Sequence, residues 1–121
     1  MSTFITLKGT EYELATTLRV AFKVQGQHAH KPYAEIFASL GGMKIEEQIN
    51  IAYQAFAIAN PDEAKVITEK VFLDSFLDTY NVGELMEILE AIIEGIMGKK
   101  LMEKAKTEEE TEDEATEEEG N

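Results

Sequence analysis

Cysteine is absent from the 121 residues, and no apolar run approaches the length of a membrane span. Without cysteine the chain forms neither a disulfide nor a thiolate metal site, which fits a reducing compartment. A membrane-spanning helix needs roughly 20 apolar residues. The segment from Met1 to Leu7 has neither the basic region nor the apolar run of a signal peptide. The sequence therefore indicates a cytoplasmic protein with no membrane partner.

Basic residues are also few, since eleven Lys and Arg oppose 24 Asp and Glu and give a formal net charge of −13. Nine of these acids lie in residues 107–121, which contain no base, so residues 1–106 carry only −4. Contacts to phosphates need clusters of Lys and Arg. The nearest such cluster, in residues 99–106, adjoins the acidic segment. We expect no nucleic-acid partner.

Catalytic and metal-binding signatures are missing as well. His28 and His30 form a His-x-His pair, but a zinc site needs three or four ligands. The segment Gly41-Gly42-Met43-Lys44 lacks the glycine spacing and the following Ser or Thr of a phosphate loop. Acids one turn apart, such as Asp74 and Asp78, are typical of a solvated helix face. We therefore predict no enzyme, no catalytic residue, no metal and no cofactor.

The N-terminal region alternates apolar and polar residues in two segments, Thr3 to Leu7 and Glu11 to Thr16. The intervening Lys8-Gly9-Thr10 contains the glycine that a short turn requires. These segments predict a β-hairpin within residues 1–16. A lone hairpin is marginal in water, so its apolar side chains are expected to dock on helices. The candidates for this docking are Phe4, Ile5, Leu7, Tyr12 and Leu14.

Three helices are predicted between the hairpin and Asn60. The first follows Thr16-Thr17 and ends near Gln27, the second is short and spans residues 32–40, and the third spans residues 44–59. The third has a long apolar face and is expected to be central. The predicted apolar face of the first helix consists of Leu18, Ala21 and Phe22.

A fourth helix is predicted from the segment that begins with Asn60 and Pro61. Asn60 is a favoured capping residue, Pro61 suits the first helical position, and Glu63 completes a pattern like a capping box. The helix is expected to run to about Tyr80, with Val66 widening its inward face. The sequence thus predicts a new helix directly after the Asn60-Pro61 break.

The last helix, predicted from Asn81 to Met102, has a wide apolar face that something must cover. Gly95 and Gly98 each cost about 1 kcal/mol relative to Ala in a helix interior. We therefore expect the part before Gly95 to pack on the domain, and residues 96–106 to need a neighbouring subunit or a client. Methionines usually pack in a core, but flexible thioethers also suit surfaces that accommodate differing partners. The candidate partner or self-association surface is Met86, Ile96, Met97, Leu101 and Met102.

From Thr107 onward the sequence contains no large apolar residue to offset the entropy of ordering. Residues 107–121 are predicted to be a disordered acidic tail, and residues 1–106 a single domain. The predicted fold class is mainly α. It is a compact bundle of four to five helices with an N-terminal β-hairpin and a disordered acidic C-terminal tail.

Four features share a layout with one protein family. They are the short first strand with Lys8-Gly9-Thr10-Glu11-Tyr12-Glu13-Leu14, the helix after Thr16-Thr17, the Ala59-Asn60-Pro61 break, and the helix Glu84-Leu85-Met86-Glu87-Ile88-Leu89-Glu90-Ala91 with its acidic end. This layout, over about residues 3–105, resembles the tail assembly chaperones of long-tailed (siphovirus-type) phages of Gram-positive bacteria.

The resemblance implies a helical protein of the host cytoplasm that is absent from the mature virion. Such a protein would bind the phage tape measure protein and keep it soluble until tail tube subunits polymerise around it. In that family a longer frameshift product often recruits the tail tube protein. A homo-oligomer is also expected, because such chaperones coat a long client in many copies. A helical interaction module or adaptor unrelated to phage is the alternative, and a small carboxylate enzyme is a third hypothesis.

Overall fold

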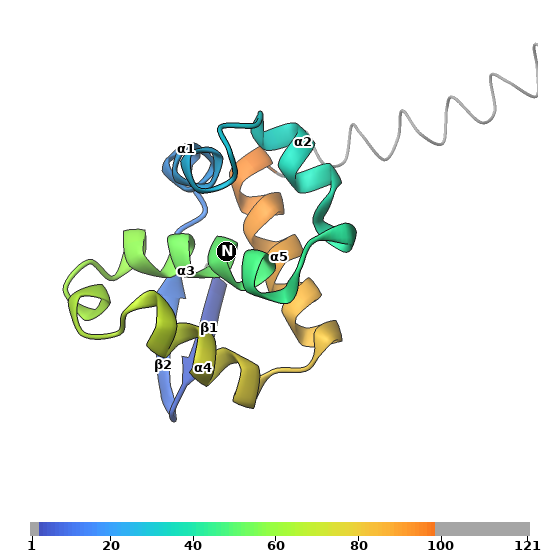
Figure 1. The fold of residues 1–121 in the computed structure, drawn as a ribbon. Coiled ribbons are helices and arrows are strands. Elements are labelled where there is room, and N and C mark those ends of the chain that lie inside the picture. Colours follow the sequence, from blue (N-terminus) through green and yellow to red (C-terminus); the bar gives the residue numbers. More distant parts are fainter. Residues whose placement is uncertain (1–2, 99–121) are drawn as a thin grey trace, which may run out of the picture.

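Helix α3 (Ile45–Ala59) is the central helix of the described chain. The structure, a computed structural model, describes residues 3–98. Within them α3 contacts strand β2 and helices α1, α4 and α5 (Figure 1). The elements in chain order are β1 (Thr3–Leu7), β2 (Thr10–Leu14), α1 (Leu18–Gln27), α2 (Tyr33–Ala38), α3 (Ile45–Ala59), α4 (Glu69–Thr79) and α5 (Val82–Met97). The predicted mainly helical fold with an N-terminal hairpin is confirmed.

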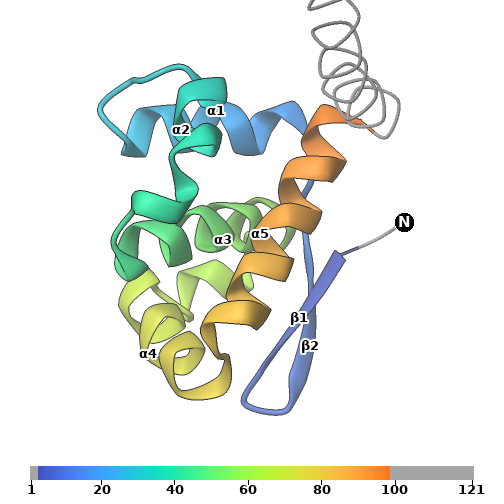
Figure 2. The same ribbon diagram turned by 90° about the vertical axis from the view of Figure 1, so that its right-hand side faces the viewer.

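The two strands form an antiparallel hairpin in which Leu7 pairs with Thr10. The turn is Lys8-Gly9, whose φ angles of 50° and 83° are both positive, as a type I′ turn requires. Thr10, expected in the turn, belongs to β2 instead. The hairpin packs beside α5, which crosses the face of the domain in Figure 2. Of the predicted docking residues, Ile5, Leu7 and Leu14 are buried and Tyr12 is partly buried, whereas Phe4 is exposed.

The predicted apolar face of α1 is wrong. Val20 and Val24 are fully buried, while Leu18 and Phe22 are largely exposed to solvent. Ala21, which was assigned to the inward face, is indeed buried. The helix has apolar residues on two opposite sides, so periodicity alone allowed either orientation. Packing against α3 and α5 selects the valine side.

The prediction that a helix starts at Asn60 is also wrong. Asn60 ends α3, and its Nδ2 donates to the backbone oxygens of Glu13 at 2.7 Å and Phe56 at 3.0 Å. Its amide therefore ties the end of α3 to the hairpin and does not cap a following helix. A short 3-10 turn follows at Glu63–Lys65, and α4 begins only after Thr68, with Val66 exposed between them.

A row of aromatic rings joins α3 to α4 through the core. The centroid distances are 5.2 Å for Phe56 and Phe72, 5.3 Å for Phe72 and Phe76, and 4.6 Å for Phe76 and Tyr80. The row ends at the hairpin, because the Tyr80 hydroxyl accepts from the Thr6 N–H at 2.8 Å and donates to the Thr6 carbonyl. The rings thus connect α3, α4 and β1.

Helix α5 begins with the predicted capping box. The Asn81 Oδ1 accepts from the Glu84 N–H at 2.8 Å, and the Glu84 carboxylate accepts from the Asn81 N–H at 2.9 Å. The two side chains therefore satisfy two backbone donors that the helix itself leaves unpaired.

Asn81→Ala is expected to lower the free energy of unfolding by about 1 kcal/mol, since it removes one half of the capping box. Chemical denaturation followed by circular dichroism measures the change. Asn81→Ser, which keeps a capping oxygen, is the control and should lose less. Equal losses in the two variants would contradict the capping role.

The prediction that the apolar residues after Gly95 need a neighbouring subunit or a client to cover them is wrong for Ile96. The helix continues to Met97, and Ile96 packs against the core of its own chain. A Cβ built on Gly95 would lie 2.4 Å from the Thr16 Cβ, so this glycine allows the close approach of the segment between β2 and α1. Residues 99–106 and the tail predicted over 107–121 lie outside the described residues.

Candidate interaction surface

The predicted partner surface lies at the outer edge and end of α5. Met86 and Ile96 are partly buried against the core, and Met97 is partly buried in the last turn of the helix. Leu101 and Met102 lie outside the described residues. The structure thus places three of the five residues on α5. Each of the three is partly buried and partly exposed to solvent.

Within residues 3–98, the largest apolar exposure on a single helical face lies on α1. Leu18 is 77% exposed and Phe22, one turn later, is 68% exposed. Together with Arg19 they line a shallow surface hollow. Single exposed apolar residues are normal, but two that are one turn apart form a stripe suited to a partner helix. We name Leu18, Phe22, Arg19 and Lys23 the α1 stripe.

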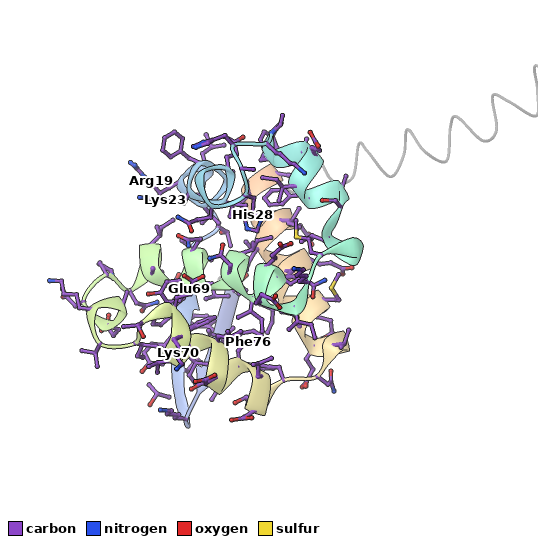
Figure 3. All side chains as sticks on the ribbon, in the orientation of Figure 1. Arg19, Lys23, His28, Glu69, Lys70 and Phe76 are labelled. Carbon is purple, nitrogen blue, oxygen red and sulfur yellow. The ribbon has the colours of Figure 1, made fainter. Side chains whose placement is uncertain are left out.

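The α1 stripe is basic in an otherwise acidic chain. Residues 14–34 contain Arg19, Lys23 and Lys31 but no Asp or Glu. Figure 3 shows Arg19 and Lys23 projecting from the same side of α1, the side away from α5. An acidic partner would therefore be attracted to this side of the domain.

Helix α5 carries the opposite charge on its outer face. Glu87, Glu90 and Glu94 are exposed, and residues 82–97 include no Lys or Arg. With 100° of rotation per residue, Met86 and Met97 lie beside these acids on one edge of the face. We name these five residues the α5 ridge.

A polar network lies between the end of α1 and helices α3 and α4. His28 Nε2 lies 3.2 Å from Asn50 Oδ1, and Asn50 Nδ2 donates to the Glu69 carboxylate. Because an amide oxygen only accepts, His28 carries its proton on Nε2. Burial raises the pKa of nearby Tyr53, and the negative charge of Glu69 raises it further. The network fastens the α1–α2 connection to the core, which gives it a structural role.

The sequence interpretation missed this network because its members lie 22 and 19 residues apart. The connection that positions His28 has positive φ at Ala29 and His30, which is uncommon for residues other than glycine. A hollow beside the network is lined by acidic side chains, by Lys70 and by apolar side chains. Within residues 3–98 no three His, Asp or Glu side chains gather where they would hold a metal ion.

No helix in the described part of the chain has the length and apolar character needed to cross a membrane. No protein-family model, curated protein or solved structure matches the chain. The chemistry of the α1 stripe and the α5 ridge, together with the layout of the sequence, is therefore what indicates a function.

Proposed function

We propose that the chain is a phage tail assembly chaperone, which binds helices of the tape measure protein and keeps that protein soluble during tail tube assembly. The observation that carries the proposal is the solvent exposure of Leu18 and Phe22 on one helical face. A client built of amphipathic helices offers apolar stripes of matching spacing. The chaperone acts in the host cytoplasm and is released before the virion is complete.

The size of the α1 stripe requires that many copies act on one client. Burying Leu18 and Phe22 fully would contribute about 1.5–3 kcal/mol each. The loss of translational and rotational freedom opposes this gain, so a single stripe binds in the millimolar range or more weakly. Binding by many copies along a long client raises the overall affinity without any new type of contact. A homo-oligomer and multivalent apolar contacts are therefore part of the proposal.

The charges of the α1 stripe favour particular client helices. Arg19 and Lys23 flank the apolar pair, so a client helix with acids beside its apolar stripe is complementary to them. In the proposed function the tail tube protein is recruited through a longer frameshift product and not through this stripe. The chain described here contributes solubility, to which its net charge of −13 adds by self-repulsion.

Replacing both apolar residues of the stripe, as in Leu18→Ser with Phe22→Ser, is expected to abolish the solubilisation of co-expressed tape measure fragments. The reason is that the apolar contacts with the client are lost while the core is untouched. The measurement is the soluble fraction of the tape measure fragment after co-expression.

The matched control is Val66→Ser with Val82→Ser, because these side chains are 79% and 66% exposed and lie outside the stripe. This control is expected to solubilise as well as the unmodified chain. Solubilisation that survives loss of the stripe, or that falls equally in both double variants, would contradict the proposal.

A helical adaptor unrelated to phage is the second candidate, because the α1 stripe suits any amphipathic helix with an acidic flank. The two functions would use the same α1 stripe and differ only in the protein that binds to it. Neighbouring genes for tail tube and tape measure proteins, and preference for tape measure helices over unrelated amphipathic peptides, would favour the chaperone.

A further inference from the structure

We propose that residues 108–119, which we name the acidic segment, bind the α1 stripe of their own chain through Arg19 and Lys23 until a client displaces them. The inference deepens the proposed function and rests on it in treating the client as the competitor. It names a regulation of the same surface, because a client helix reaches the two bases only by competing with the acidic segment.

Charge identifies the α1 stripe as the surface that the acidic segment binds. The segment contains nine acids and no base. Residues 14–34 contain three bases and no acid, which makes them the longest acid-free stretch of the chain. Every other lysine within residues 3–98 has an acid no more than three positions away in the sequence. The bases of the α1 stripe are therefore the least neutralised positive charges of the described domain.

The two bases are also accessible in the folded domain. Arg19 and Lys23 are both exposed, and they project from the side of α1 that faces away from α5 (Figure 3). The salt bridge found within residues 3–98 joins Lys65 to Asp62 and involves neither of them. No acid of the described domain thus competes with the acidic segment for these two side chains.

The path of the chain brings the acidic segment within reach of α1. Helix α5 ends beside the start of α1 (Figure 2), and its Gly95 lies against the side chain of Thr16. Residues 98–107 connect the end of α5 to the segment, and at about 3.3–3.6 Å per extended residue they would span up to about 35 Å. The distance along α1 from Leu18 to Lys23 is only about 8 Å. The segment can therefore reach the stripe within one copy.

This tether makes a weak interaction sufficient. Exposed ion pairs are individually weak, and a free acidic peptide would bind two bases poorly. A segment joined by a short linker, however, has an effective concentration in the millimolar range. An intrinsic Kd of the same size therefore covers the bases in about half of the copies.

The composition of the acidic segment determines which clients displace it. The segment has no large apolar residue, so it pairs with the bases and leaves Leu18 and Phe22 uncovered. A helix that offers an apolar stripe as well as acids gains contacts that the segment cannot make. A chain that is only acidic gains none of them. The segment thus restricts the α1 stripe to amphipathic helices with acidic flanks.

The test places a spin label on the acidic segment through Thr116→Cys in the full chain, which has no cysteine of its own. At low salt the amide signals of α1 are expected to be lost from nuclear magnetic resonance spectra. The signals of α4, which lies across α3 from α1 (Figure 1), should remain. The α1 signals should return with Arg19→Gln and Lys23→Gln, or at about 1 M salt, where the Debye length is about 3 Å.

A mixing experiment separates contact within one copy from contact between copies. Spin-labelled chain without isotope is mixed with isotope-labelled chain that carries no spin label, and the α1 signals of the mixture are expected to persist. Their equal loss in the mixture would overturn the proposal, because the segment would then bind another copy. Persistence of the α1 signals in the doubly labelled chain, or a loss that survives Arg19→Gln with Lys23→Gln, would also overturn it.

Competition is measured with a synthetic amphipathic helix that has Leu on one face and Glu beside it. Replacing the nine acids of the segment by Gln and Asn is expected to lower the Kd of this peptide about twofold to tenfold, since more copies have uncovered bases. In the Arg19→Gln and Lys23→Gln background the same replacement should have little effect. An equal gain in both backgrounds would indicate general charge repulsion and would overturn the proposal.

The matched control is Asp74→Asn with Asp78→Asn, which removes two acids from α4 and should leave the Kd of the peptide unchanged. The spin-label experiment requires no client, so its failure alone would leave the proposed function standing. Solubilisation of tape measure fragments that survives Leu18→Ser with Phe22→Ser would contradict the proposed function without removing the contact between the segment and α1.

Discussion

Phe56→Ala is expected to lower the free energy of unfolding by about 3–5 kcal/mol, as large-to-small replacements of buried aromatic residues do. Phe56 is fully buried on the central helix, and its ring contacts those of Tyr12, Tyr53 and Phe72. Its removal leaves a cavity among rings that belong to three different elements. A loss of this size is a large fraction of the stability of a small domain. Urea denaturation followed by circular dichroism measures it.

Phe22→Ala is the matched control for this change. The substitution is chemically identical, but Phe22 is mostly exposed, so the free energy of unfolding should change by less than about 0.5 kcal/mol. In the solubilisation assay Phe22→Ala is nevertheless expected to lower the soluble fraction of the tape measure fragment, while the protein itself stays folded. Similar stability losses in the two variants would show that α1 does not have the orientation described.

Gly95→Ala is expected to destabilise the domain by about 1–3 kcal/mol, the range for overpacking. Helix propensity alone predicts the opposite, because Ala is favoured over Gly by about 1 kcal/mol in a helix interior. The new Cβ, however, would lie 2.4 Å from the Thr16 Cβ and 2.8 Å from its Cγ2 and Oγ1. The backbone of one segment must therefore move. Thermal and urea denaturation report the loss.

Two further variants test this explanation. Gly26→Ala, within α1, meets no atom within 4 Å and should stabilise the domain slightly, as propensity predicts. In a Thr16→Gly background, Gly95→Ala should lose its cost, because the three crowded atoms are gone. If Gly95→Ala is equally harmful with and without Thr16, the close approach is not the reason for this glycine.

Features that depend on neighbouring residues in the chain were predictable from sequence. The capping box of Asn81 and Glu84 involves residues three positions apart, and the structure shows both of its hydrogen bonds. The hairpin turn likewise follows from Gly9 and the alternation on either side of it. In each case the physical cause lies within a few residues, so the pattern is sufficient.

Features that depend on distant partners were not predictable in this way. Asn60 has the local context of a helix cap, but its side chain bonds to the carbonyl of Glu13, 47 residues away. On α1 both sides are apolar, and only packing against α3 and α5 decides that Val20 and Val24 are inside. Local propensity is a weak guide wherever tertiary contacts select among such alternatives.

The candidate site was not predicted for the same reason, because distant contacts decide which side of α1 is buried. Leu18 and Phe22 were predicted to face the core. The α1 stripe therefore became visible only in the structure, where both side chains are exposed. The absence of acids from residues 14–34 was the signal available in the sequence. An apolar pair in the longest acid-free stretch of an acidic protein is a reason to expect a partner there.

The contact between Thr6 and Tyr80 also determines when the domain can fold during its synthesis. The two residues are 74 positions apart, and ribosomes add about 5–20 residues per second. The hairpin therefore leaves the ribosome about 4 to 15 s before α4 is complete, and α5 follows later still. During this interval Ile5 and Leu7 lack the complete cover of α4 and α5, the two helices that contact β1 in the finished domain. The nascent chain thus completes its core only after α5, which ends at Met97, has been translated.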